Sequence, residues 1–226
     1  MTEIDFHAHI LPRCDHGSDG VKTSLRQLKL ARGAGVDLIC ATSHFYGHQT
    51  SVEDFLRKRQ RCYEELMANV PADSPRILLG AEVLAFEGIE RLPDLKELRL
   101  QGTKLLLLEM PFKHWSEGLL DSVEALSEDD SFHIVLAHVD RYDRKEVEKL
   151  FRLDNVWGQV NVDNLKKRFG TRHLRTWAQE GLIVAVGSDI HGTETGYKDW
   201  LTCQRRYAED WETIMKRTNG RLKELL

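Results

Sequence analysis

The chain alternates short, nearly continuous apolar runs with longer stretches in which apolar residues recur every three to four positions. Runs rich in Leu, Ile and Val are typical of strands buried on both faces, and the second spacing is typical of amphipathic helices. Strands are predicted at residues 4–10, 36–44, 76–85, 104–112, 132–142, 156–165 and 182–192. Helices are predicted at 22–33, 52–69, 88–99, 116–128, 144–153 and 171–181, with one or two more from residue 198 onward.

This alternation predicts an α/β fold built on a parallel sheet, because parallel strands need a crossover element between them. The seven strand–helix units follow one another without a linker or a change of composition. We therefore expect one domain over residues 1–226, shaped as a closed or nearly closed barrel. An open, doubly wound sheet is the alternative architecture.

Composition and charge narrow the class of protein. The 226 residues are 41% hydrophobic and 30% charged, with a formal net charge of -4. This balance favours a soluble globular protein, and it gives no basic surface of the kind that binds nucleic acid. No apolar stretch approaches the roughly 18 residues of a membrane span, so we expect no membrane insertion.

The cysteines and the start of the chain indicate a compartment. The four cysteines are scattered and include no Cys-x-x-Cys pair, and the first residues lack the pattern of a signal peptide. Both features favour a reducing environment, so we expect a cytoplasmic protein without a disulfide framework or a thiolate zinc site.

Side chains that can bind metals follow the predicted strands at one end. In parallel α/β folds, functional groups lie at the carboxyl ends of the strands. Each of the seven strands carries or ends in such residues, in order His7 and His9, His44, Glu82, Glu109, His138, Asn161 and Asp163, and Asp189 and His191.

The spacing within two of these groups strengthens the pattern. His7 and His9 are two residues apart, as are Asp189 and His191. Residues two apart on a strand point to the same face, so each pair can enter one cavity. Burying this many carboxylates and imidazoles is costly unless cations offset the cost, and this donor set suits zinc, iron or manganese.

The remaining histidines are less informative. His133 is expected at the opposite end of the fifth strand, with a structural role, and His173 on a helix surface. His48 and His114 lie in loops that follow the second and fourth strands, near the rim where a substrate would bind.

Several short motifs, taken in order, resemble those of the polymerase-and-histidinol-phosphatase (PHP) family. They are HAH, ATSH, GAEV, LLEMP, LAHVDRY and GSDIHG, and they span essentially the whole chain. The opening DFHAHILPRCDHG resembles the manganese-dependent bacterial tyrosine phosphatases of the CpsB/CapC/YwqE group.

The resemblance implies a distorted seven-stranded barrel, the PHP fold, with up to three divalent metal ions. Manganese is expected, with iron or zinc as alternatives. It implies a first metal on His7, His9, Asp189 and a bridging Glu82, a second on Glu82, Glu109 and His138, and a third on His16, His44 and His191. Arg141 corresponds to the arginine that contacts phosphate in the family.

The chain departs from the group's usual pattern at three places, and at one of them ATSHFYGH replaces a more usual Pro-His-His or Pro-His-Tyr string. His16 stands where the tyrosine phosphatases usually have Asp, and HVDR keeps His138 and Arg141 of a His-Pro-Glu-Arg string but not its middle pair. Glu109 matches the tyrosine phosphatase branch, since many other branches have His there.

The activity implied is metal-dependent hydrolysis of phosphomonoesters, with protein phosphotyrosine as the substrate and a bacterial tyrosine kinase of polysaccharide export as a partner. A water activated by two cations would attack phosphorus directly, and no covalent phosphoenzyme is expected. Arg141 would bind the phosphoryl oxygens. His48 would contact substrate, and His48 or Asp140 would act as the acid for a leaving group poorer than a phenolate.

Two other functions remain open at this stage. One is a small-molecule phosphatase such as a histidinol phosphatase, and the other is a metal-binding regulatory module without catalysis. Cysteine-dependent phosphatases are disfavoured, because none of the four cysteines is followed by Arg six positions on. No Gly-x4-Gly-Lys motif for nucleotide phosphates occurs.

Overall fold

The computed structural model describes residues 1–165, 172–192 and 195–224. The strands are β1 Ile4–Ala8, β2 Leu38–Ala41, β3 His44–Phe45, β4 Arg76–Leu79, β5 Glu82–Leu84, β6 Leu105–Glu109, β7 His133–Leu136, β8 Val156–Asn161 and β9 Ile183–Gly187. The helices are α1 Val21–Gly33, α2 Val52–Met67, α3 Glu117–Glu128, α4 Arg144–Leu150, α5 Val162–Leu165, α6 Arg172–Gln179, α7 Thr195–Arg206 and α8 Ala208–Glu224, with 3₁₀ helices η1 Ile89–Arg91, η2 Leu95–Leu98 and η3 Val139–Arg141. Residue 171, the first of a predicted helix, lies outside the described residues.

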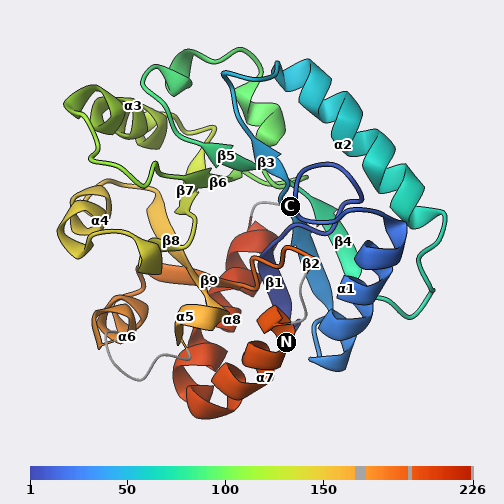
Figure 1. The fold of residues 1–226 in the computed structure, drawn as a ribbon. Coiled ribbons are helices and arrows are strands. Elements are labelled where there is room, and N and C mark those ends of the chain that lie inside the picture. The colour runs from blue at the N-terminus through green and yellow to red at the C-terminus, as the bar shows by residue number, and fades with distance from the viewer. Residues whose placement is uncertain (166–171, 193–194, 225–226) are drawn as a thin grey trace.

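The strands pair in parallel, and the helices lie outside them (Figure 1). One sheet has the order β1-β2-β4, and the other has the order β3-β5-β6-β7-β8-β9. Backbone hydrogen bonds continue from one sheet to the other, with Gly80 N donating to Ala41 O (3.0 Å) and Glu82 N to Ser43 O (3.1 Å). The predicted α/β fold with parallel strands is confirmed.

Two of the predicted strands are interrupted. The run at 36–44 forms β2 and then β3, and the run at 76–85 forms β4 and then β5. The second break falls at Gly80, where a Cβ atom would lie 2.4 Å from the Leu100 side chain. Beyond the breaks, His44 and Glu82 are direct partners in the β3–β5 ladder, so the interruption places both side chains at the same level.

The first and last strands lie side by side, as a barrel requires. Asp189 N donates to His7 O (2.7 Å), and His9 N donates to Ile190 O (3.3 Å). Ser188 N donates to the buried carboxylate of Asp5 (2.9 Å). The described residues of β1 and β9 form no ladder, so the barrel is nearly closed and this junction is joined by residues that follow β9.

The helices begin where short polar side chains can satisfy free backbone N–H groups. The hydroxyl of Ser51 accepts from Asp54 N at the start of α2 (3.1 Å), and that of Ser116 accepts from Leu119 N at the start of α3 (3.2 Å). Such caps contribute about 1 kcal/mol each.

The predicted helix at 88–99 is wrong. The segment contains only η1 and η2, with Pro93 between them. Proline disfavours helical geometry in the residue before it, and Leu92 is extended with ψ 120°. Asp94 then adopts a left-handed φ of 58°, which ends any continuous helix.

The core lies between the strands and the surrounding helices. Phe6 on β1, Ile39 on β2 and Leu106 on β6 are at most 1% exposed. Burying each such side chain contributes about 1.5–3 kcal/mol, so the strands are held rigidly beneath the loops that follow them. None of the helices in the described part of the chain has the length and apolar character needed to cross a bilayer.

Candidate metal centre

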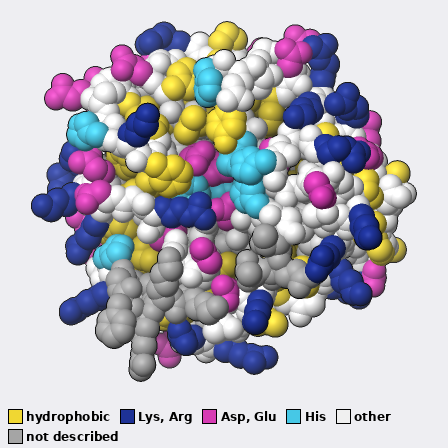
Figure 2. Space-filling model, viewed as in Figure 1, with side chains coloured by type: hydrophobic (Ala, Val, Ile, Leu, Met, Phe, Trp, Pro, Cys, Tyr) yellow, Lys and Arg dark blue, Asp and Glu magenta, His cyan; other side chains and the backbone are white. Residues whose placement is uncertain are grey.

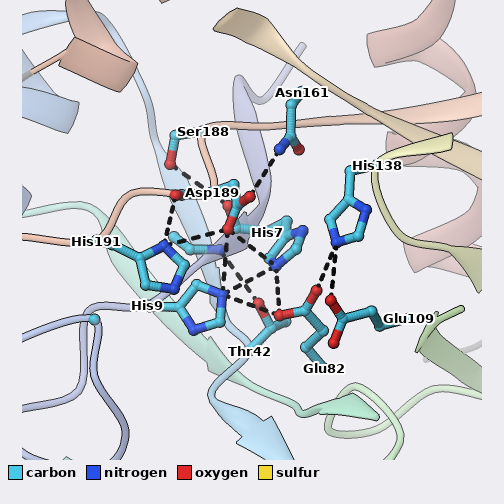
Figure 3. A network of polar contacts seen from close by, with 12 residues as sticks. His7, His9, Thr42, Glu82, Glu109, His138, Asn161, Ser188, Asp189 and His191 are labelled. Atoms are coloured by element: carbon cyan, nitrogen blue, oxygen red, sulfur yellow. Dashed lines mark hydrogen bonds and ion pairs between the residues drawn. The ribbon is translucent and has the colours of Figure 1, made fainter. Parts of the chain in front are cut away.

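The predicted metal ligands lie together at the carboxyl ends of the strands, and Figure 3 labels seven of them, all but His16 and His44. They come from β1, β3, β5 and β6 and from the loops that follow β1, β7 and β9. Figure 2 shows histidine and acidic side chains gathered in a hollow on this face, bordered by hydrophobic side chains. The nine residues are His7, His9, His16, His44, Glu82, Glu109, His138, Asp189 and His191.

Glu82 stands at the centre of the cluster and is 1% exposed. Its Oε2 atom lies 3.1 Å from His7 Nε2 and 3.2 Å from His9 Nε2. The same oxygen lies 3.0 Å from His44 Nδ1, and the Oε1 atom lies 3.0 Å from His138 Nε2. One carboxylate thus contacts four imidazoles.

Glu109 lies on the side of the cluster formed by β6 and β7. Its Oε1 atom is 3.6 Å from His138 Nε2, and its Oε2 atom is 4.0 Å from His44 Nδ1. His138 follows β7 with a left-handed φ of 33°, and this conformation turns the chain at the end of the strand.

Asp189 and His191 lie on the opposite side. Asp189 Oδ1 is 3.4 Å from His9 Nε2 and 3.6 Å from His7 Nε2. The expectation that Asp189 and His191 share a strand face is wrong, because β9 ends at Gly187 and Asp189 has a φ of 49°. The two residues meet through the loop instead, where His191 Nδ1 lies 2.9 Å from the carbonyl oxygen of Asp189.

His16 and Arg141 lie at the edge of the cluster. His16 is exposed, and its ring stacks at 4.7 Å from the rings of both His44 and His191. The guanidinium of Arg141 donates to Asp189 Oδ2 at 2.8 Å, and its side chain is 35% exposed.

The other predicted residues lie farther out. His48 is exposed, with its ring 6.0 Å from that of Tyr46. Both carboxylate oxygens of Asp140 accept hydrogen bonds, from Asn161 N (2.8 Å) and from the Asn164 side chain. This arrangement suits a positioning role better than proton donation.

His133 lies where it was expected, and His173 lies on the expected helix but is only partly exposed. His133 begins β7, at the end of the strand away from the cluster, and its ring lies 5.6 Å from that of Trp157. His173 lies on α6, half-buried against Trp177 with the ring centroids 4.8 Å apart.

Two residues that support the cluster are not apparent from the sequence pattern. Gln159 Oε1 lies 3.1 Å from His7 Nδ1 and accepts from His138 N at 2.8 Å. Asp15 Oδ2 lies 2.7 Å from His9 Nδ1 and accepts from His44 N at 2.9 Å. A polar side chain two residues before Asn161, within an apolar strand, is the signal that could have identified Gln159.

These supporting bonds orient the histidines toward the centre. In a neutral imidazole, the nitrogen that donates a hydrogen leaves the other nitrogen with a free lone pair. His7 and His9 donate from Nδ1 to Gln159 and Asp15, so both Nε2 atoms face inward, 3.0 Å apart, and each offers a lone pair there once its ring is neutral. His191 likewise donates from Nδ1, and its Nε2 faces His44 Nε2 at 3.4 Å.

The donor set fits divalent cations. Lone pairs that face one another and a buried carboxylate repel, and a cation between them removes the repulsion. Glu82 Oε2 is buried without a hydrogen-bond donor of acceptable geometry, as an oxygen reserved for a metal would be. Donor atoms lie within 4.8 Å of one another in three overlapping groups: His7, His9 and Glu82; His9, His44 and His191; and His44, Glu82 and Glu109.

The pKa values show how the metal-free cluster balances its charge. Burial would lower the pKa of His9, but the hydrogen bond to Asp15 and the nearby carboxylates of Asp189 and Glu82 raise it well above its ordinary value. Burial also opposes the shift of His138, yet Glu109 and Glu82 raise its pKa to about 9. Burial would raise the pKa of Glu82, but the neighbouring imidazoles lower it well below its ordinary value. Carboxylates that hold protons on imidazoles in this way also attract metal ions, whose uptake releases those protons.

The fold and this site define a class: an α/β barrel protein whose strand ends carry a cluster of imidazoles and carboxylates able to hold metal ions. The family model for capsular polysaccharide synthesis, CpsB/CapC, matches residues 3–219. The chain belongs to this family, and the resemblance inferred from its motifs is confirmed.

Solved structures agree with this assignment. The chain is similar to a crystal structure from the pair YwqE of Bacillus subtilis and CpsB of Streptococcus pneumoniae, described as unique metal-dependent tyrosine phosphatases. The identity is 22%, over 99% of this chain and 95% of that chain, with a TM-score of 0.78, which shows a shared fold.

More distant barrels also match. Dihydrodipicolinate synthase from Acinetobacter baumannii is 16% identical, over 97% of this chain and 80% of that chain, with a TM-score of 0.52. Beta-aspartyl dipeptidase from Fervidobacterium islandicum is 13% identical, over 97% of this chain and 74% of that chain, with a TM-score of 0.51. A search of curated proteins gave no match.

Proposed function

We propose that this protein is a metal-dependent phosphomonoesterase that hydrolyses phosphotyrosine in proteins. The observation that carries the proposal is the convergence of nine imidazole and carboxylate side chains with one arginine at the carboxyl ends of the strands. Family membership and the fold shared with a structure described as a metal-dependent tyrosine phosphatase support it.

The residues divide among up to three divalent metals in this proposal, with manganese as the expected ion. His7, His9 and Asp189 would hold one, Glu109 and His138 a second, and Glu82 would bridge the two. His16, His44 and His191 would hold a third. When bound, such ions supply a water of lowered pKa and neutralise the charge of the phosphoryl group.

Arg141 would bind the phosphoryl oxygens. Its guanidinium is fixed by Asp189 at 2.8 Å and remains partly exposed, so N–H groups are available at the mouth of the site. A planar guanidinium can donate two hydrogen bonds to one phosphoryl group and favours the charge that builds up there in the transition state. A tyrosine phenolate, with a pKa of about 10, leaves without a dedicated acid.

The physiological substrate in this proposal is a phosphotyrosine protein, such as a tyrosine kinase of polysaccharide export. The family description connects the chain with capsular polysaccharide synthesis. A protein substrate requires an open site, and the hollow that holds the cluster opens on the face shown in Figure 2.

The test is a comparison of His138→Ala with the wild type, with manganese supplied. We expect the wild type to hydrolyse a phosphotyrosyl peptide faster than histidinol phosphate, and His138→Ala to lose bound manganese and activity together. His133→Ala is a matched control, because His133 begins β7, the strand that His138 follows, at the end away from the cluster. It should keep both properties.

The other outcomes identify the alternatives. Preference for histidinol phosphate would indicate a small-molecule phosphatase. Manganese binding without hydrolysis of any phosphomonoester would indicate a regulatory module.

A further inference from the structure

A second hollow lies beside the metal centre and shares a wall with it. It encloses about 350 Å³, and Arg141 and Tyr142 line one side while the segment from Pro111 to Trp115 lines the other. That volume lies at the lower end of the range for small-molecule sites. Because Arg141 also contacts Asp189 in the metal centre, a group bound to Arg141 can reach into both spaces.

Phe112 forms an aromatic wall of this hollow. One face of its ring lies nearly parallel to the His138 ring, at 5.7 Å and 13°. The side chain nevertheless remains 64% exposed, which places it among the few large hydrophobic side chains exposed in the described part of the chain. Exposing an aromatic ring beside a polar site costs free energy unless a ligand covers it.

The loop that carries Phe112 is braced by two other aromatic residues. Met110 N donates to the Tyr142 hydroxyl (3.0 Å), and Trp115 Nε1 donates to Pro111 O (2.9 Å). The Trp115 and Tyr142 rings then meet edge to face at 5.5 Å and 72°. The position of Phe112 is therefore set before a ligand arrives, which reduces the entropy lost on binding.

The two carboxylates that line this hollow already have partners. Asp143 accepts from Lys145 N at 2.9 Å as the cap of α4, and Glu146 pairs with Lys149 at 2.9 Å. Neither carboxylate requires a cationic ligand. The exposed ring of Phe112 is the apolar feature of the hollow that a ligand would cover.

We propose that Phe112 and Tyr142 form a subsite that binds the planar aromatic leaving group of the substrate, with its phosphoryl group on Arg141 and the metal centre. This inference rests on the proposed function, and it makes Phe112 a specificity-determining residue that selects aryl over alkyl phosphates. The free face of the Phe112 ring would stack on the substrate ring, in the offset or edge arrangement that aromatic pairs prefer.

The test measures dissociation constants of two non-hydrolysable probes, phenylphosphonate and methylphosphonate, on the manganese-loaded protein. Phe112→Ala should weaken phenylphosphonate about 2- to 12-fold more than methylphosphonate, the range expected for one aromatic pair. Phe112→Trp should restore the difference. Met67→Ala is the control, because Met67 is also exposed, at 43%, but lies on α2 away from the site.

A merely structural role for Phe112 would weaken both probes equally, and this result, or a failure of Phe112→Trp to restore the difference, would overturn the subsite. The kinetic counterpart is a raised KM for a phosphotyrosyl peptide with a smaller change in kcat. Because the probes measure binding without turnover, the subsite and the proposed phosphatase activity are tested independently. If the wild type hydrolyses no phosphomonoester but binds phenylphosphonate through Phe112, the subsite stands and the proposed phosphatase activity is rejected.

Discussion

At the residue scale, hydrogen bonds at Nδ1 orient three histidines of the cluster, His7, His9 and His191, so that Nε2 points inward. Asp15 is the clearest case, because it holds His9 Nδ1 at 2.7 Å and also accepts from the backbone N–H groups of Gly17 and His44. Its carboxylate pKa is lowered mainly by His9, against the effect of burial, so the group is ionised at neutral pH. A fixed negative charge behind His9 orients the ring and makes its Nε2 a stronger donor to metal.

Replacing Asp15 by Ala should weaken manganese binding by about 10- to 100-fold, the usual effect of removing such a partner. Titration of metal-free protein with manganese gives the affinity. Asp15→Asn keeps one oxygen that can accept from His9, so its loss should be smaller. Equal affinities for the wild type and Asp15→Ala would show that His9 needs no such orientation.

The sequence identified the ligand-type residues but not their supports. Residues such as Glu82 and His138 stand out because they interrupt or end apolar runs at the same end of each strand. Asp15 contacts His9, which is 6 positions away, and Gln159 contacts His7, which is 152 positions away. Such contacts depend on the three-dimensional arrangement. In the sequence, only the polar position of Gln159 within an apolar strand indicated one of them.

At the element scale, every predicted apolar run contains a strand, but several predicted strands extend too far. The run at 132–142 yields β7, which ends at Leu136, and the run at 182–192 yields β9, which ends at Gly187. Left-handed conformations at His138 and Asp189 follow these ends. Hydrophobicity does not encode such turns, and strained backbone of this kind clusters at functional sites.

The C-terminal helices are anchored to the first strand by Glu3. Its carboxylate accepts from the indole N–H groups of Trp200 (3.0 Å) and Trp211 (2.8 Å). Glu3→Ala leaves both buried indole N–H donors without this acceptor, so we expect a loss of about 1–3 kcal/mol in the free energy of unfolding. Urea denaturation measures it, and a change below 0.5 kcal/mol, ordinary for surface positions, would contradict the anchoring role.

The same residue gives a pH dependence. Burial raises the pKa of Glu3 in the folded protein. Its contribution to stability is therefore present below its unfolded pKa and is lost as the pH rises through the folded pKa. The stability of the wild type relative to Glu3→Gln, which keeps the acceptor but does not titrate, should fall as the pH rises above the ordinary pKa of a glutamate. A difference that stays flat or rises would disprove the burial of this charge.

At the scale of the whole molecule, the candidate metal centre contains residues from both sheets of the nearly closed barrel. His7 on β1 lies 3.1 Å from Glu82 on β5 and 3.6 Å from Asp189 in the loop after β9, so cations there would tie the first and last strands together. An ion that binds only the folded state stabilises it by about 2.7 kcal/mol at 100 times its dissociation constant.

Manganese at that concentration should raise Tm by about 5–10 °C, given about 2–4 °C per kcal/mol for a chain of this size. Thermal unfolding followed by circular dichroism, with and without the metal, measures the shift. The shift should shrink in His138→Ala, and an equal shift in that variant would place the binding elsewhere.

The central claim is that the clustered imidazoles and carboxylates bind divalent cations on which phosphate release depends. The most direct measurement follows phosphate release from a phosphotyrosyl peptide against the number of manganese ions bound per chain, starting from metal-free protein. Phosphate release should begin only as manganese binds, and it should rise until more than one ion is held per chain. Hydrolysis at full rate by the metal-free protein, or no uptake of manganese, would contradict the central claim.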